Sequence, residues 1–311
     1  MINNNIEYVK PLIKWVGGKT QIIDKIIDNF PNVINNYHEV FLGGGSVMLA
    51  LLQNIENNKI KLTGSINVYD INMSLIYLYK NIQNKSNEVL VEINKIITIY
   101  NNLKGDVINM KPKNLDEGLT SQESYFYWIR TEFNKLTQEQ KNLPKGTAYF
   151  IFLNKTCFRG VYREGPKGFN VPFGHYKNPE IINEEHVLVI KNLIKNVNFV
   201  HSTFENTFDI IKKQQRDNNS ENNFIYLDPP YAPENEKSFV GYTSKGFNLE
   251  QHKLLFTICK DYKFLMSNAD VSLVLDNFNS PQYKIQKILC KRSINSKKPE
   301  SKTNEVLIKS Y

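Results

Sequence analysis

The sequence predicts an α/β fold in which one sheet is built from both ends of the chain. The first observation is a series of short apolar runs near the start, each followed by glycines or an aspartate and then by a helical pattern. The second is that strand-like runs return only after a long helical block. Together they predict a sheet domain at 1–80 and 193–311, with a mostly helical insertion at 81–192.

Composition sets the broad class of protein. The 311 residues are 41% hydrophobic and include no signal-peptide pattern and no apolar run of membrane-spanning length, so we expect a cytoplasmic protein outside the membrane. Three widely spaced cysteines predict neither disulfides nor a metal site. The net charge of +8 favours a polyanionic partner, although many lysine-rich proteins carry such charge without one.

The first part of the chain supplies the opening units of the sheet. Isoleucines at helical spacing, followed by a proline, predict a helix over 19–29. The apolar run 40–42 predicts a strand that enters a triple glycine and a helix over 47–53. The run 66–69 predicts a second strand, which ends in Asp70 before another helical pattern. This succession is the start of a βαβ arrangement.

Helical patterns dominate the middle of the chain. Helices are predicted at 89–103, 124–136 and 147–158. Strands are predicted again at 198–201, 224–227, 263–266, 283–288 and 305–308, and a polar loop at 212–223. The sheet therefore resumes after the helical block.

The clearest chemical signal is Asp228-Pro229-Pro230-Tyr231, which directly follows the apolar run 224–227. Two prolines cannot continue a strand, so the backbone turns outward at a carboxyl end, where open α/β sheets bind ligands. A simple turn with a capping aspartate is the alternative. On a buried strand, however, this tetrapeptide is a signature of amino-methyltransferases.

These residue types suit methyl transfer to an exocyclic amine of a nucleobase. Such an amine is a poor nucleophile because its lone pair is delocalised into the ring. Asp228 and the carbonyl oxygen of Pro229 can each accept one amino hydrogen, and both contacts strengthen as positive charge develops on nitrogen. Tyr231 offers a ring face on which the base can stack.

Two glycine-containing stretches are candidate ligand loops. PLIKWVGGKTQ ends like a phosphate-binding loop, but Ile13 stands where that loop needs its first glycine, so we reject a nucleotide-hydrolysis site. The stretch 41–45 lets a ligand approach the backbone, and Asp70 follows at a spacing that suits a contact with ribose hydroxyls. A dinucleotide site is less favoured because Met48 replaces the small residue of its fingerprint.

The segment 154–177 combines cations with aromatic rings. Its basic residues are Lys155, Arg159, Arg163, Lys167 and Lys177, its one acid is Glu164, and its aromatic residues are Phe158, Tyr162, Phe169, Phe173 and Tyr176. Cations attract phosphates, and aromatic side chains fill an emptied base stack. A solvated basic loop is the alternative for any single residue, but the cluster favours DNA.

Taken in order, these motifs resemble the Dam-like (DpnM-like) adenine-N6 DNA methyltransferases with the alpha-type motif order. That order is Lys-Trp-x-Gly-Gly-Lys at 14–19, Phe-x-Gly-x-Gly at 41–45, Asp70, a helical insertion, and 228–231. The stretches FLNKTCFRGVYREGPKGFNVPFGHYKNP, YTSKGFNLEQH and RSINSK…EVLIKSY resemble further parts of the family. The resemblance covers nearly the whole chain.

The resemblance implies a Rossmann-like methyltransferase domain that uses S-adenosyl-L-methionine as methyl donor and no metal. Asp228, Pro229, Pro230 and Tyr231 would be catalytic. The resemblance, together with the glycine loop at 41–45, assigns eight positions to donor binding. They are Trp15, Lys19, Phe41, Gly43, Gly45, Asp70, Phe204 and Asp228. The ammonium of Lys19 would meet the donor's carboxylate.

The partner implied by the resemblance is double-stranded DNA, bound by a monomer or a weak dimer through the inserted target-recognition domain. Lys14 would face DNA, Phe158 would insert at the flipped base, and Arg163 and Pro172 would lie near the recognition bases. Arg159 departs from the small amide that known members carry there. The hypothesis for the recognition sequence is GATC.

Two other classes of function stay open from the sequence alone. Asp/Asn-Pro-Pro-Tyr sites also methylate RNA and protein glutamine, and a catalytically inactive DNA-binding accessory protein would keep much of the pattern. The amino-terminal motif and the segment 154–177 favour duplex DNA. Intact Lys19, Asp70 and Asp228 argue against an inactive protein.

Overall fold

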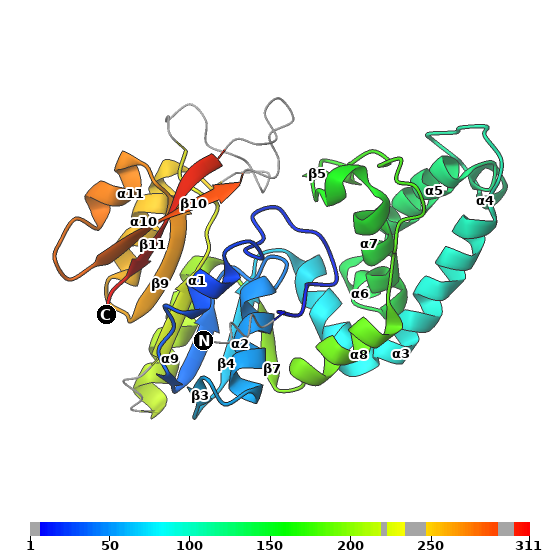
Figure 1. Cartoon of the computed structure of the whole chain (residues 1–311). Coiled ribbons are helices and arrows are strands. Elements are labelled where there is room, and N and C mark those ends of the chain that lie inside the picture. Colours follow the sequence, from blue (N-terminus) through cyan, green and yellow to red (C-terminus); the bar gives the residue numbers. More distant parts are fainter. Residues whose placement is uncertain (1–6, 219–222, 234–246, 292–301) are drawn as a thin grey trace. The chain divides into compact units, whose positions relative to one another are not determined.

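The computed structural model describes residues 7–218, 223–233, 247–291 and 302–311, which form two compact units (Figure 1). The first unit comprises Met1–Tyr8, Lys19–Ile71 and Asn196–Tyr311. The second comprises Val9–Gly18 and Asn72–Lys195. The boundaries expected from the sequence lay at 80/81 and 192/193, and the stretch Val9–Gly18 was expected in the sheet domain.

The first unit is built on a mixed sheet, so the predicted α/β class is confirmed. In the described part of the chain the sheet has seven strands in the order β10-β11-β9-β8-β2-β4-β7. These are β2 (Asn36–Glu39), β4 (Ile66–Asp70), β7 (Val197–His201), β8 (Asn223–Leu227), β9 (Phe264–Ala269), β10 (Lys284–Lys291) and β11 (Lys302–Lys309). A separate parallel pair is formed by β1 (Val33–Ile34) and β3 (Lys61–Leu62).

The five strands from β9 to β7 run parallel, whereas β11 and β10 are antiparallel additions at one end. From β2 the chain proceeds outward through β4 and β7, and it then returns to the other side of β2 as β8. The sheet therefore reverses its order between β2 and β8. In open α/β sheets such a switch point, at the carboxyl ends of the strands, is where ligands bind.

The helices of the first unit connect these strands. They are α1 (Ile23–Ile27), α2 (Ser46–Glu56), α9 (Phe204–Asn218), α10 (Leu249–Cys259) and α11 (Ser272–Asn277). The predicted helix over 19–29 was too long, because 19–22 form turns in which the N–H of Ile22 donates to the carbonyl of Lys19. The predicted loop over 212–223 was wrong up to Asn218, where α9 ends.

The strand at the switch point differs from the prediction. The apolar run 40–42 follows β2 and is not part of it. Strand β2 instead contains Tyr37, His38 and Glu39, all buried. These polar side chains are tolerated at the centre of the sheet because they form hydrogen bonds there. The hydroxyl of Tyr37 donates to Glu39, and Nδ1 of His38 is hydrogen-bonded to the hydroxyl of Tyr69. Because these residues are polar, a search for apolar runs did not predict the strand.

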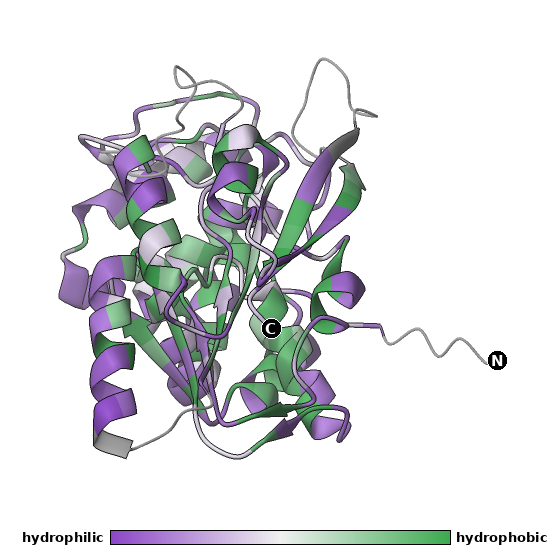
Figure 2. Ribbon diagram, turned by 90° about the vertical axis from the view of Figure 1, so that its left-hand side faces the viewer, coloured by the Kyte–Doolittle hydropathy of each residue, from purple (hydrophilic) through white to green (hydrophobic). Residues whose placement is uncertain are grey.

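Apolar burial holds this unit together. Every residue of β8 is buried, and Figure 2 shows hydrophobic residues (green) gathered in the strands. On one face, Leu227, Met266, Val306 and Ile308 belong to a single cluster of buried side chains. Because this cluster spans β8, β9 and β11, it fixes the position of the chain on either side of the segment that starts at Asp228.

The second unit is mainly helical in its described residues. Its helices are α3 (Met73–Asn102), α4 (Leu115–Gly118), α5 (Gln122–Lys135), α6 (Gln138–Lys141), α7 (Pro144–Thr156) and α8 (Glu184–Leu193), with a short 3₁₀ turn η1 (Phe158–Gly160). A small hairpin is formed by β5 (Glu164–Gly165) and β6 (Gly168–Phe169). Asn72 caps α3, and Lys85 interrupts its helical geometry. No helix in the described ranges has the length and apolar character needed to cross a membrane.

Candidate active site

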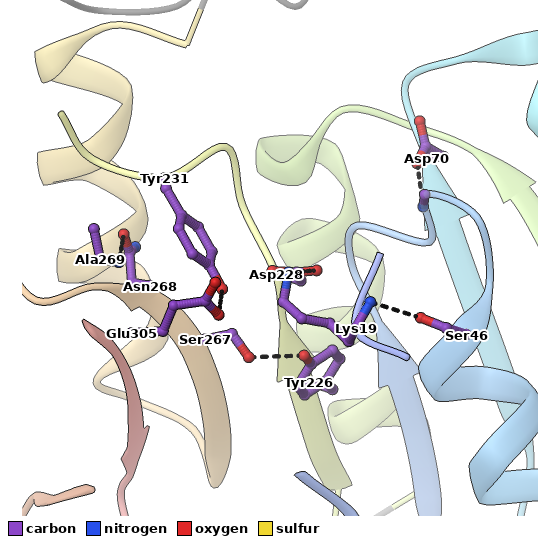
Figure 3. A network of polar contacts seen from close by, with 11 residues as sticks. Lys19, Ser46, Asp70, Tyr226, Asp228, Tyr231, Ser267, Asn268, Ala269 and Glu305 are labelled. Atoms are coloured by element: carbon purple, nitrogen blue, oxygen red, sulfur yellow. Dashed lines mark hydrogen bonds and ion pairs between the residues drawn. The ribbon is translucent and has the colours of Figure 1, made fainter. Parts of the chain in front are cut away.

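The carboxyl ends of three parallel strands bring the predicted chemical residues of the first unit to one edge of the sheet. Strand β2 ends at Glu39 and leads into the glycine loop, β4 ends at Asp70, and β8 ends directly before Asp228. Figure 3 shows Asp70, Asp228 and Lys19 at this edge. Residues far apart in sequence are therefore neighbours because parallel strands end on the same side.

Lys19 and Asp228 form an ion pair at the switch point (Figure 3). The Nζ of Lys19 lies 2.7 Å from Oδ2 of Asp228, and the two side chains are only 5% and 18% exposed. The backbone N–H of Lys19 donates to the hydroxyl of Ser46 at the start of α2. The same ammonium lies 4.8 Å from the ring centroid of Tyr231. Lys19 thus contacts two residues of the Asp-Pro-Pro-Tyr segment.

The environment of Asp228 works against its ionisation. Burial raises the pKa of this carboxyl to about 6, the ion pair with Lys19 opposes that rise, and the charge of Glu305 adds to it. Oδ1 is buried and has no hydrogen-bond partner in the described residues. A buried acceptor without a donor is costly, so this oxygen is ready to accept a hydrogen from a bound ligand.

Strands β11 and β9 hold the end of the Asp-Pro-Pro-Tyr segment and the residue that follows it. The hydroxyl of Tyr231 donates to Oε2 of Glu305 at 2.8 Å, and the N–H of Ala232 donates to Oδ1 of Asn268 at 3.1 Å. Burial, together with the charges of Asp228 and Glu305, raises the pKa of Tyr231 well above its usual value. The phenol is therefore neutral at physiological pH.

The glycine loop is closed by Asp70. The N–H of Gly43 donates to Oδ2 of Asp70 at 2.9 Å. Gly43 and Gly45 both have positive φ, at 52° and 81°, where a side chain would be strained. Gly45 is also the N-cap of α2, so backbone N–H groups at the start of that helix face the edge of the sheet.

Glu39 was missed by the sequence analysis. It is 2% exposed, and its Oε2 accepts a 2.7 Å hydrogen bond from Tyr37. Burial raises its pKa to about 8; the bond from Tyr37 opposes this, and the charges of Asp228 and Asp70 add to it. A glutamate directly before an apolar run was the available signal. Three carboxyl groups therefore lie at this edge, of which Glu39 is protonated at neutral pH and Asp228 is paired with Lys19.

An aromatic group borders the glycine loop. The ring centroids of Phe41 and Phe204 lie 6.2 Å apart, so two predicted donor-site residues are brought together. Phe247, which the sequence analysis did not single out, lies 6.0 Å from Phe41 and 5.5 Å from Phe204. Phe204 and Phe247 are buried in the apolar core, so the partly exposed Phe41 is the ring of this group that can meet a planar ligand.

Lys14 and Trp15 belong to the second unit. Trp15 stacks on Tyr162, with ring centroids 5.3 Å apart. The backbone of Lys14 is held by Asn154, whose side chain accepts from its N–H and donates to its carbonyl. The Nζ of Lys14 lies 5.0 Å from the ring centroid of Tyr176. Both residues therefore contact the basic-aromatic segment 154–177, and the predicted role of Trp15 at the donor stays a prediction.

Phe158 is the exposed aromatic residue of this segment, with 49% of its surface accessible. Its N–H donates to the carbonyl of Pro172 at 2.8 Å, and the guanidinium of Arg159 lies 5.3 Å from its ring centroid. Arg159 adopts a positive φ of 57°. Phe169 and Phe173, in contrast, are buried and help to form the core of this unit.

Arg163 is oriented by the hairpin. Its Nε donates to the side-chain oxygen of Asn170 at 2.7 Å, and its Nη2 lies 3.4 Å from the carbonyl of the same residue. Lys167 and Lys177 are exposed. The structure thus brings Lys14, Phe158, Arg163 and Pro172 into one unit, while their contacts with DNA stay predictions.

No cluster of three or more histidine, cysteine, aspartate or glutamate side chains that could hold a metal occurs in the described parts of the chain. Cys157, Cys259 and Cys290 are buried thiols. Burial raises their pKa values well above the usual range, to about 12 for Cys157 and about 11 for Cys290. These thiols are therefore protonated and part of the packing.

A doubly wound sheet with an Asp-Pro-Pro-Tyr segment beside its switch point defines the class of amino-methyltransferases. Comparison with known proteins identifies the family within this class. The family model described as D12 class N6 adenine-specific DNA methyltransferase matches residues 15–294. The chain belongs to this family.

Similar proteins span nearly the whole chain. The Type II methyltransferase M.MjaIII of Methanocaldococcus jannaschii is 33% identical over 97% of this chain and 99% of its own length. The DNA adenine methylase of Haemophilus influenzae is 29% identical over 94% of this chain and 90% of its own. The Type II methyltransferase M.CviBI of Paramecium bursaria Chlorella virus NC1A is 28% identical over 82% of this chain and 80% of its own length.

Proposed function

We propose that this chain is a site-specific DNA adenine-N6 methyltransferase that transfers a methyl group from S-adenosyl-L-methionine to an adenine flipped out of duplex DNA. The observation that carries the proposal is the buried Asp228, which has one oxygen paired with Lys19 and the other without a partner in the described residues. Family membership supports adenine as the base.

The donor site is proposed at the glycine loop. S-adenosylmethionine supplies an electrophilic methyl group on a positively charged sulfur. The carboxylate of Asp70 lies against the loop at Gly43, and the positive φ of Gly43 and Gly45 leaves the backbone open to close approach. Asp70 would accept from ribose hydroxyls, and Phe41, with Phe204 behind it, would face the adenine ring. Trp15 is proposed to complete the site.

The adenine site is proposed at Asp228 and Tyr231. Oδ1 of Asp228 would accept one hydrogen of the target amine, and the carbonyl of Pro229 would accept the other. Lys19 holds the carboxylate charged, so the hydrogen bond strengthens as the amine nitrogen becomes positive during attack. Tyr231 provides the ring against which the base stacks, which aligns nitrogen with the incoming methyl group.

The second unit is proposed to recognise DNA. Exposed Phe158 would fill the gap left by the flipped base, and Lys14, Arg159, Arg163 and Pro172 would line the groove. GATC is the proposed recognition sequence, and Arg159 is the residue at which specificity could depart from it. Digestion of methylated plasmid with adenine-methylation-sensitive nucleases tests this, since protection only at other sites would reject GATC.

The test of the proposed function is transfer of isotopically labelled methyl from the donor to plasmid DNA, followed by nucleoside analysis. Label is expected in N6-methyl-2′-deoxyadenosine. Labelled cytosine, or label in RNA or protein glutamine instead of DNA, would contradict the proposal. An inactive DNA-binding protein would bind plasmid but give no calorimetric signal with S-adenosylmethionine. We further propose an intracellular enzyme that acts as a monomer or weak dimer, which sedimentation with and without DNA would test.

A further inference from the structure

Tyr231 is held at both its ring face and its hydroxyl. The ammonium of Lys19 lies 4.8 Å from the ring centroid, and the hydroxyl donates to Oε2 of Glu305 at 2.8 Å (Figure 3). A tyrosine side chain free at both points would rotate about two bonds. With the hydroxyl oxygen held by Glu305, the direction of the ring axis is fixed, and the ammonium against the ring face restrains rotation about that axis.

The position of Glu305 is set by the sheet. It lies on β11, where it pairs with Ala269 at the carboxyl end of β9. Strand β9 pairs in parallel with β8, which leads into the Asp-Pro-Pro-Tyr segment. Because β11 runs antiparallel to β9, it presents Glu305 at the edge where β8 ends. The hydrogen bond from Ala232 to Asn268 on β9 confirms that the segment crosses this part of the edge.

The packing around Glu305 leaves its strand little freedom to move. The next residue, Val306, and Ile308 are fully buried in the apolar cluster on one face of the sheet. Glu305 points to the other face, where its antiparallel partner is the buried Ile288. A carboxylate on such a strand acts as a rigid acceptor, and Tyr231 supplies the matching donor.

We propose that Glu305 is a positioning residue that holds the Tyr231 ring in place for stacking of the target adenine. The inference rests on the proposed function, because it deepens the role of the same site. Glu305 touches neither substrate in this account. It acts through the phenol hydroxyl, and so its effect belongs to the step in which the base is aligned.

A double-mutant cycle tests this. Tyr231→Phe removes only the hydroxyl, Glu305→Ala removes only the acceptor, and Glu305→Gln keeps a neutral acceptor of the same length. Each of the first two changes is expected to lower kcat about tenfold or more, the size expected for a hydrogen bond to a charged group. Glu305→Gln is expected to stay within about threefold of wild type, since the neutral bond is weaker but present. The KM for the donor is expected to remain unchanged in all three.

The combined Tyr231→Phe, Glu305→Ala protein is expected to be no slower than Tyr231→Phe alone, because both changes break one contact. Independent, multiplying effects would overturn the proposal, as would a Tyr231→Phe enzyme with wild-type kcat or a Glu305→Gln enzyme as slow as Glu305→Ala. Tyr231→Phe keeps the test decisive if Glu305→Ala fails to fold. Asn304→Ala, at an exposed neighbouring position of β11, is the matched control.

A second readout follows base flipping directly. With 2-aminopurine at the target position, wild-type enzyme is expected to raise its fluorescence, and Glu305→Ala is expected to change that signal because the base stacks on a misaligned ring. An identical signal for both enzymes would overturn the proposal. Failure of the proposed function has a different signature, since wild-type enzyme would then methylate no adenine, whereas failure of this inference leaves wild-type activity intact.

Discussion

Lys19 and Asp228 are joined by a 2.7 Å ion pair that links the amino-terminal Lys-Trp-x-Gly-Gly-Lys motif to the Asp-Pro-Pro-Tyr segment. From its sequence, the ammonium of Lys19 was expected to meet the donor's carboxylate. In the structure it contacts the aspartate that carries the proposed chemistry. The ammonium of Lys19 lowers the pKa of the Asp228 carboxyl, and the effect of this contact on activity can be measured.

The first prediction concerns the pH dependence of activity. The pKa of Asp228 is about 6, so kcat/KM is expected to fall as the pH drops through this value and the carboxylate takes up a proton. Lys19→Met removes the cation that lowers this pKa, so the acid limb should move upward by about one pH unit or more. Lys25→Met, an exposed lysine on α1, is the control. An acid limb that stays in place in Lys19→Met would contradict the account.

The second prediction concerns donor affinity. Asp70→Ala removes the acceptor that holds the Gly43 N–H and the proposed partner of the ribose hydroxyls. Calorimetry with S-adenosylmethionine is expected to show a Kd about tenfold higher or more, as for loss of hydrogen bonds to a charged group. Asp276→Ala, an exposed aspartate on α11, should bind like wild type. Unchanged affinity in Asp70→Ala would place the donor elsewhere.

The third prediction concerns stability. Glu39 has a folded pKa of about 8, above its usual value of 4.5, so the folded protein keeps a proton that the unfolded chain loses in this window. Its contribution to the free energy of unfolding therefore falls as pH rises from about 4.5 to 8, by at most about 1.4 kcal/mol per pH unit. Glu39→Gln cannot titrate but can still accept from Tyr37.

Urea unfolding of both proteins at several pH values between 5 and 8 measures this difference. The stability of Glu39→Gln relative to wild type is expected to rise with pH across the window. A constant difference between the two proteins would show that Glu39 is ionised in the folded state, and it would contradict the electrostatic description of the site.

The fourth prediction concerns DNA binding. Lys167 and Lys177 are exposed in the basic-aromatic segment. If each neutralises a phosphate, Lys167→Gln and Lys177→Gln should each weaken binding and reduce the slope of log K against log salt by about one. Lys95→Gln, on the exposed side of α3, should leave the slope unchanged. Equal slopes for all three variants would remove this segment from the DNA contact.

Continuous apolar runs explain which elements could be predicted from the sequence. Strands β4 and β8 were predicted closely because parallel central strands are buried on both faces and are therefore mainly apolar, interrupted in the predicted run 66–69 only by Asn67. Strand β2 was missed because its buried residues Tyr37, His38 and Glu39 carry polar groups, which bond to one another or to Tyr69 inside the sheet. A buried polar strand has no apolar signature in sequence.

In the candidate site, too, some residues could be predicted from local sequence patterns and others could not. Asp70 and Asp228 were found because each follows an apolar run directly, and chain order alone places them at strand ends. The contact between Tyr231 and Glu305 could not be predicted, since it depends on β11 lying antiparallel beside β9. Strand order is decided by packing of the whole sheet, which local patterns do not encode.

The most direct test of the account compares wild type with Asp228→Ala in one methylation assay. Both proteins are incubated with S-adenosylmethionine and plasmid, the DNA is digested, and N6-methyl-2′-deoxyadenosine is measured by mass spectrometry, with DNA binding followed in parallel. We predict N6-methyl-2′-deoxyadenosine from wild type, and none from an Asp228→Ala protein that still binds DNA. Equal methylation by the two proteins, or no methylated adenine from wild type with any duplex, would contradict the account.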